Sequence, residues 1–130
     1  MNLGLVTESF SQDDQRWLAS EHGADTAQSV TLDISDFTAA THYPNGFIPS
    51  GTVLQAGTDA TKCGPFDPTD EDAVAVGILL EAVHVQGTAD PNGAMVKHCF
   101  IDTTHMPFNS TTKGGWGGTA AANLPAVVAR

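Results

Sequence analysis

The feature that most restricts the fold is the stretch of residues 74–85, which is apolar at almost every position. Glu81 and His84 are the main interruptions. Successive side chains of a strand point to opposite sides, so a strand that is apolar throughout is covered on both faces. We therefore predict that this stretch forms a central strand, bent at Gly77.

Shorter strand patterns surround it. Residues 30–35 alternate apolar with polar side chains, which predicts a half-buried strand. Residues 53–54 and 95–101 predict two further strands, and residues 57–72 predict a long acidic loop. The turn signals between these elements are Asn45-Gly46, Pro49-Ser50-Gly51 and Asp90-Pro91-Asn92-Gly93.

Two further patterns lie near the ends of the chain. Residues 12–21 predict a short helix whose only large apolar residues are Trp17 and Leu18. Such a helix is not stable alone, so it must dock either on its own domain or on a neighbouring subunit. Residues 119–124 predict a helical turn, and residues 127–128 predict a strand at a sheet edge.

These patterns indicate a mainly β fold with one or two short helices. The 13 glycines and seven prolines fit short strands joined by many turns. We divide the chain into an extended N-terminal arm, residues 1–28, which includes the short helix, and a β-rich domain, residues 29–130, which ends in a Gly-rich segment.

The charge balance restricts the partners. Five basic and 15 acidic residues give a net charge of −10, which repels phosphate, so we expect no direct nucleic-acid binding. No apolar run of about 18 residues predicts a membrane span. The first 30 residues lack a signal-peptide pattern, so we expect synthesis in a cytosol, with Cys63 and Cys99 as free thiols.

Two groups of residues have metal-binding chemistry without metal-binding spacing. Residues 67–72 are acidic, but their spacing does not match a calcium loop and Pro68 interrupts them. The second group consists of Cys63, His98, Cys99 and His105. Its adjacent members His98 and Cys99 point to opposite faces of a strand. We therefore expect no metal and no cofactor.

Catalytic patterns are equally weak. Ser50 lacks the Gly-x-Ser-x-Gly pattern, and a serine in a turn commonly bonds nearby backbone. Four carboxylates lie near predicted strands and would be the candidates in a small β-fold hydrolase or lyase: Asp33, Asp36, Glu81 and Asp102. Nothing in the sequence brings them together, so we predict that the protein is not an enzyme and keep the hydrolase as the least favoured alternative.

Three stretches are informative together, namely residues 48–54, 73–80 and 95–101. Taken in this order, they resemble the head decoration proteins of tailed bacteriophages, the lambda gpD-like capsid-stabilising family. Residues 48–54, Ile-Pro-Ser-Gly-Thr-Val-Leu, resemble its turn that enters a strand. Residues 73–80, Ala-Val-Ala-Val-Gly-Ile-Leu-Leu, resemble a second strand, and residues 95–101 a third. Residues 14–23 and 30–38 are similar to decoration proteins of phages that infect actinobacteria.

The resemblance implies a small β-barrel or β-tulip-like domain that binds the outer surface of the expanded phage head as a homotrimer. Its partner would be the major capsid protein, its location the virion, and its role stabilisation against internal DNA pressure, without catalysis or cofactor. The arm would add a strand to the shell. The expected capsid contacts are then the apolar residues Leu3, Leu5, Val6, Phe10, Trp17 and Leu18. The alternative is a virion surface adhesin or minor capsid module that binds a host glycan.

Overall fold

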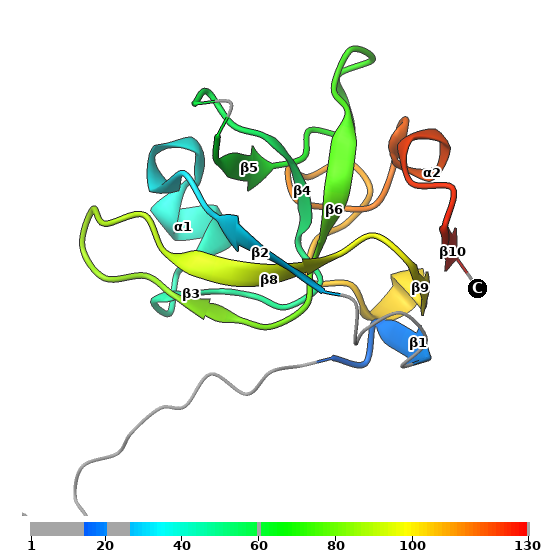
Figure 1. Cartoon of the computed structure of the whole chain (residues 1–130), viewed down its shortest axis with the longest axis horizontal. Helices are drawn as coiled ribbons and strands as arrows, with labels where there is room; N and C mark the ends of the chain where they lie inside the picture. Colours follow the sequence, from blue (N-terminus) through cyan, green and yellow to red (C-terminus); the bar gives the residue numbers. More distant parts are fainter. Residues whose placement is uncertain (1–14, 21–26, 60, 130) are drawn as a thin grey trace, which may run out of the picture.

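The computed structural model describes residues 15–20, 27–59 and 61–129, which form a mainly β fold with several sheets and short helices (Figure 1). This confirms the predicted fold class. The strands are β1 (Leu18–Ser20), β2 (Gln28–Thr31), β3 (Phe47–Ile48), β4 (Val53–Ala56), β5 (Cys63–Pro65), β6 (Ala75–Leu79), β7 (Val83–His84), β8 (Asn92–Val96), β9 (Cys99–Ile101) and β10 (Val127–Ala129). The helices are α1 (Ala39–His42) and α2 (Ala120–Asn123), with 3-10 turns at Ile34–Asp36 and Thr103–His105.

The strands form three sheets. The largest has the strand order β2-β8-β6-β4-β5, with antiparallel neighbours throughout. A β-bridge joins Leu32, directly after β2, to Cys63 in β5, and the Asp33 N–H donates to the Cys63 carbonyl at 2.8 Å. Strands β2 and β5 are the two edges of this sheet, and the residues directly after β2 contact β5. The sheet is therefore strongly curled.

A second sheet lies beside the first and has the order β1-β9-β10. Its central strand β9 is antiparallel to β1 and parallel to β10. Strands β3 and β7 form a separate antiparallel pair. The prediction of a strand at residues 127–128 is confirmed, because β10 lies at one edge of the second sheet.

The three central strands of the large sheet have apolar clusters on both faces. In each strand one residue faces the cluster around Trp17 and its neighbour faces the other cluster. The pairs are Val53 and Leu54 in β4, Ile78 and Leu79 in β6, and Val96 and Met95 in β8. The central position predicted for the apolar stretch is thus confirmed for β6.

The apolar stretch nevertheless forms two strands, not the single one predicted. β6 ends at Leu79, and β7 belongs to another sheet, where it pairs with β3. The register between β4 and β6 shifts beside Gly77, which fits the predicted irregularity. A Cβ at this position would collide with the Met95 side chain, so glycine is required for the close approach of β8.

Three other predictions need correction. The helix predicted over residues 12–21 is wrong in its described part, because Leu18–Ser20 is strand β1 paired with β9. Asn92 and Gly93 are not in a turn but in β8, and the chain turns earlier, where the Ala89 N–H bonds to the Gln86 carbonyl. The strand predicted over residues 95–101 is divided between β8 and β9, which lie in different sheets.

The turn at Asn45-Gly46 is confirmed by the positive φ of Gly46, 84°, and by the bond from its N–H to the Tyr43 carbonyl. The helical turn predicted over residues 119–124 is confirmed as α2. The sequence did not indicate α1, and it did not indicate that β5 lies within the acidic loop of residues 57–72.

Candidate functional site

The described chain begins at a hydrogen-bonded junction with two stretches, residues 48–54 and residues 73–80. The indole N–H of Trp17 donates to Ser50 Oγ at 2.8 Å, and the Ser50 hydroxyl donates to the Leu80 carbonyl at 2.6 Å. Gln15 Nε2 donates to the same carbonyl at 2.8 Å. We call Gln15, Trp17, Ser50 and Leu80 the junction. It fixes the chain that follows residues 1–14 to both stretches.

Backbone bonds extend the junction into the large sheet. The Gly51 N–H donates to the Leu79 carbonyl at 2.8 Å, and the Leu79 N–H donates to the Thr52 carbonyl at 2.9 Å. The Thr52 hydroxyl donates to the Pro49 carbonyl at 2.7 Å. Ser50 is 3% exposed, and its Oγ both accepts and donates within the protein, so the geometry gives it a structural role.

The expected capsid contacts have different surroundings. Leu3, Leu5, Val6 and Phe10 lie outside the described residues. Trp17 is fully buried, and Leu18 is half-buried in β1 opposite Ile101. The Trp17 side chain therefore has no surface to offer a partner. The arm expected over residues 1–28 would include β1, but β1 is part of the folded domain.

The cysteines are free, and their surroundings suppress their reactivity. Burial raises the pKa of the Cys99 thiol to about 11 and also raises the pKa of Cys63. A thiol with a raised pKa is a poor nucleophile and a poor metal ligand near neutral pH. Among the described residues, no group of three or more His, Cys, Asp or Glu side chains is placed to hold a metal ion.

Two of the four candidate carboxylates, Asp33 and Asp102, bond to residues nearby in the sequence. Asp33 accepts from the Ser35 N–H, and Asp102 accepts from the Thr104 N–H at 3.0 Å. In the acidic loop, Asp67 accepts from the backbone and hydroxyl of Thr69. These bonds hold the pKa values of Asp67 and Asp102 below the usual range. Such local bonds stabilise turns.

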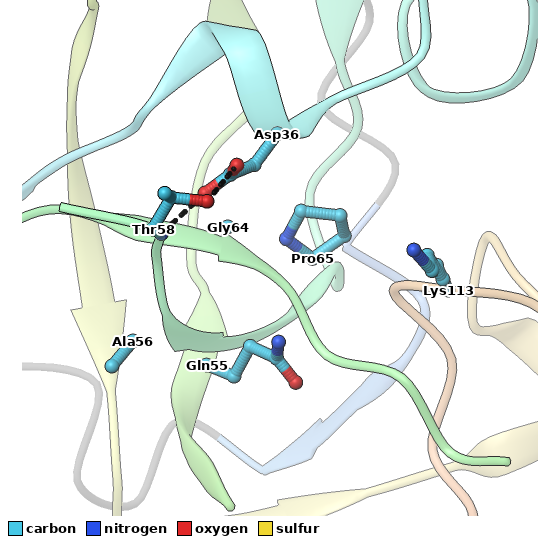
Figure 2. Close-up of a pocket in the computed structure, with 7 residues that line it drawn as sticks. All are labelled: Asp36, Gln55, Ala56, Thr58, Gly64, Pro65 and Lys113. Atoms are coloured by element: carbon cyan, nitrogen blue, oxygen red, sulfur yellow. Dashed lines mark hydrogen bonds between the residues drawn. The ribbon is translucent and has the colours of Figure 1, made fainter. Parts of the chain in front are cut away.

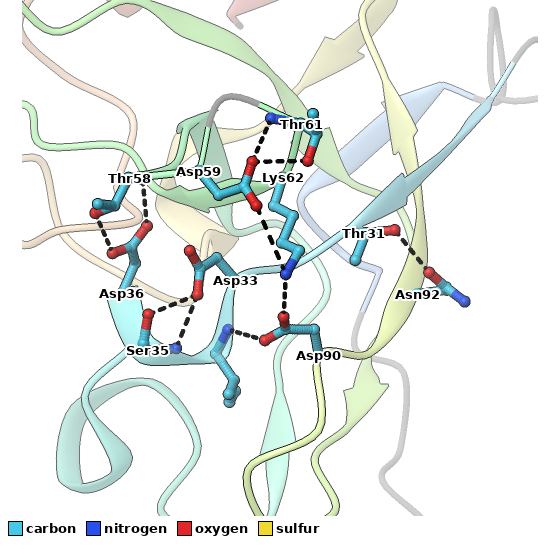
Figure 3. Close-up of polar contacts among 11 residues, drawn as sticks. Thr31, Asp33, Ser35, Asp36, Thr58, Asp59, Thr61, Lys62, Asp90 and Asn92 are labelled. Atoms are coloured by element: carbon cyan, nitrogen blue, oxygen red, sulfur yellow. Dashed lines mark hydrogen bonds and ion pairs between the residues drawn. The ribbon is translucent and has the colours of Figure 1, made fainter.

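One ion-pair cluster connects three separate segments (Figure 3). The Lys62 ammonium lies 2.6 Å from Asp90 Oδ2 and 3.8 Å from Asp59 Oδ2. The other oxygen of Asp90 accepts from the Ile34 N–H at 2.9 Å. The hydrogen bond to Lys62 lowers the pKa of Asp90. The positive charge among these carboxylates is the Lys62 ammonium, so the cluster has the structural role of connecting these loops.

A polar depression lies beside this cluster (Figure 2). Its lining residues are Asp36, Gln55, Ala56, Thr58, Gly64, Pro65 and Lys113. The Asp36 carboxylate accepts from the backbone and hydroxyl of Thr58 at 2.9 and 2.8 Å, and Gln55 Oε1 accepts from the Asp67 N–H at 3.1 Å. The lining has no aromatic residue, whereas small-molecule sites are usually lined by apolar and aromatic side chains.

His42 is a buried polar residue that the sequence did not single out. The Thr38 N–H donates to Nδ1 at 2.9 Å, so the proton of the neutral ring is on Nε2, which donates to the Lys113 carbonyl at 3.0 Å. The rings of Phe37 and Phe108 pack edge-to-face against the imidazole. His42 therefore connects α1 to the loop around Lys113.

We expect the free energy of unfolding to decrease as the pH falls below about 6.5, the ordinary pKa of histidine. Burial lowers the pKa of His42, so the unfolded chain binds this proton more tightly than the folded protein. The stabilising effect of neutral His42 is complete above 6.5 and is lost as the pH falls through the lower folded pKa. Urea denaturation at a series of pH values measures it. His42→Gln should flatten the curve in this window, and an unchanged slope would show that another group is responsible.

No described helix is long and apolar enough to cross a membrane. No family model matches the chain, and no curated protein matches it either.

Proposed function

We propose that the protein is a capsid decoration protein. It binds the outer surface of an expanded phage head as a homotrimer, contacts the major capsid protein and stabilises the shell against internal DNA pressure. The observation that carries this proposal is the junction. Residues 48–54 and 73–80, the two stretches that most resemble decoration proteins, are hydrogen-bonded to each other, and Gln15 and Trp17 are attached to both.

The junction attaches the chain directly after residues 1–14 to the folded domain. Trp17 and Gln15 are fixed to the core, so residues 1–14 are joined to the domain at a defined place. An apolar segment such as Leu3, Leu5 and Val6 provides suitable side chains for strand addition to a shell protein. Three arms on one trimer would give an avidity that exceeds a single contact by about 10²–10⁴-fold.

Binding that is specific for the assembled shell would stabilise that shell by mass action. It needs an adhesive surface and no reaction. The local bonding of the candidate carboxylates and the raised pKa values of both thiols fit this role better than hydrolysis.

The test is co-sedimentation of the purified protein with expanded and with immature shells of its parent phage. We expect binding to expanded shells and the loss of this binding when residues 1–14 are deleted, without a change in the unfolding transition of residues 15–129. Saturation at three copies per threefold site would support the trimer. If the protein binds neither shell but binds glycans on an array, the proposal is overturned in favour of a surface adhesin.

A further inference from the structure

The tripeptide Pro-Asn-Gly occurs twice in the chain, at residues 44–46 and at residues 91–93. An asparagine that precedes glycine is especially prone to lose its side-chain amide spontaneously, because glycine has no side chain to hinder the attack of its own backbone nitrogen. The two copies share the same local sequence. A difference in their reactivity would therefore come from the fold.

The first copy lies in the turn between α1 and β3 (Figure 1). The Asn45 side chain is exposed and makes no hydrogen bond with the residues that the structure describes. A Cβ added at Gly46 would meet no atom within 4 Å, so the space beside this backbone is open. One hydrogen bond closes the turn, from the Gly46 N–H to the Tyr43 carbonyl at 3.0 Å. Opening it frees the Gly46 nitrogen, and surface turns open at a low cost in free energy.

The second copy is held in the large sheet. The Thr31 hydroxyl donates to Asn92 Oδ1 at 2.9 Å (Figure 3). Asn92 and Gly93 both belong to β8 and pair with the antiparallel strand β2. Directly before them, the Pro91 carbonyl accepts from the Leu32 N–H at 2.8 Å. An attack by the Gly93 nitrogen therefore requires this part of the sheet to open.

We propose that Asn45 is a site of spontaneous deamidation in the folded protein and that Asn92 is protected from this reaction. The Gly46 nitrogen attacks Cγ of Asn45, and the new C–N bond closes a cyclic imide. The bond from Cγ to Nδ2 breaks, and the side-chain nitrogen leaves as ammonia with the proton that the Gly46 nitrogen gives up. Water then adds to either imide carbonyl and opens the ring to aspartate or isoaspartate. Water is the only co-reactant.

The reaction changes the molecule at this turn. Both products add one negative charge to the net charge of −10. Isoaspartate also carries the main chain through the former side chain, which inserts a methylene group before Gly46. The Gly46 carbonyl accepts from the Val85 N–H at 2.9 Å, so the change falls directly beside the pairing of β3 with β7. The reaction needs no shell and no partner, and it is therefore independent of the proposed function.

Trypsin separates the two copies, because it cleaves after lysine and arginine. Residues 17–62 and 63–97 are then fragments with one asparagine each, Asn45 and Asn92. The experiment is incubation of the full-length protein at mildly alkaline pH, which favours loss of the proton from the attacking nitrogen. Samples taken over time are digested and analysed by mass spectrometry, and a sample digested at the start corrects for reaction during digestion.

We expect the fragment of residues 17–62 to exchange its amide for an acid at least about tenfold faster than the fragment of residues 63–97. Each additional hydrogen bond that must open first slows the attack by up to about tenfold. In urea the two fragments should react at similar rates, because only the shared tripeptide then determines the reaction. Asn45→Gln should leave the first fragment unchanged, since a glutamine side chain would have to close a larger and less favoured ring.

Three results would overturn the inference. The first is equal rates of the two fragments in the folded protein, and the second is a faster reaction at Asn92. The third is a folded protein in which Asn45 stays intact while both copies react in urea. A rate in the first fragment that Asn45→Gln does not abolish would show that the mass change arises at another residue, which also rejects the site.

Discussion

Trp17→Ala is expected to lower the free energy of unfolding by about 3–5 kcal/mol, the usual cost of removing a large aromatic side chain from a core. Trp17 has no exposed surface and packs in the same cluster as Phe66, Ile78 and Ile101. The substitution leaves a cavity and removes the N–H donor to Ser50. Urea denaturation followed by circular dichroism measures the loss.

Trp17→Phe is the matched control. It keeps most of the ring volume and loses the hydrogen bond to Ser50, so its cost should be clearly smaller than that of Trp17→Ala. If alanine costs less than about 1 kcal/mol, Trp17 is not a core residue. Such a result would again support the expectation that Trp17 contacts the capsid as part of the arm.

Gly115→Ala is expected to cost about 3 kcal/mol or more, because overpacking a rigid backbone contact forces the chain to move. A Cβ at Gly115 would collide with the backbone carbonyl of Asn109. That carbonyl cannot turn away cheaply, since it accepts from the Thr112 N–H, and the Thr112 carbonyl accepts from the Gly115 N–H. The thermal unfolding temperature should fall accordingly.

Gly46→Ala is the control that measures the cost of a left-handed backbone conformation without a steric collision. Gly46 has a φ of 84°, but a Cβ there would meet no atom within 4 Å. Its cost should therefore be limited to that of a left-handed residue, about 1–2 kcal/mol. Equal losses in the two variants would mean that the loop around Gly115 adapts, contrary to the expected rigidity.

The sequence predicted the elements whose signal is local. The central strand β6 was predictable because its neighbouring positions are apolar on both faces, and the turn at Asn45-Gly46 because a left-handed turn favours glycine. The helix over residues 12–21 was mispredicted because Asp13 and Asp14 are typical of the first turn of a helix. In its described part, pairing with β9 and burial of Trp17 determine a strand instead.

The junction could not be predicted because its parts are distant in sequence. Ser50 was expected to bond nearby backbone, yet it bonds to Leu80 and Trp17, which lie 30 and 33 positions away. His42 gave no signal at all, since an isolated histidine has no spacing to interpret. The assignment to the decoration proteins stays a prediction, which the measurement of shell binding tests.

The position of β9 between β1 and β10 has a mechanical consequence. Leu18, at the start of β1, and Ala129, at the end of β10, both lie beside Ile101. Neighbouring strands are about 4.8 Å apart, so the two points of attachment are separated by about 10 Å. Tension applied between them would pull the strands apart one hydrogen bond at a time, starting from Ile101, instead of loading all the bonds together in shear. A pull on the C-terminal end would therefore separate β10 from β9 at low force, whereas a pull on the N-terminal end would first load the bonds of Gln15 and Trp17 at the junction.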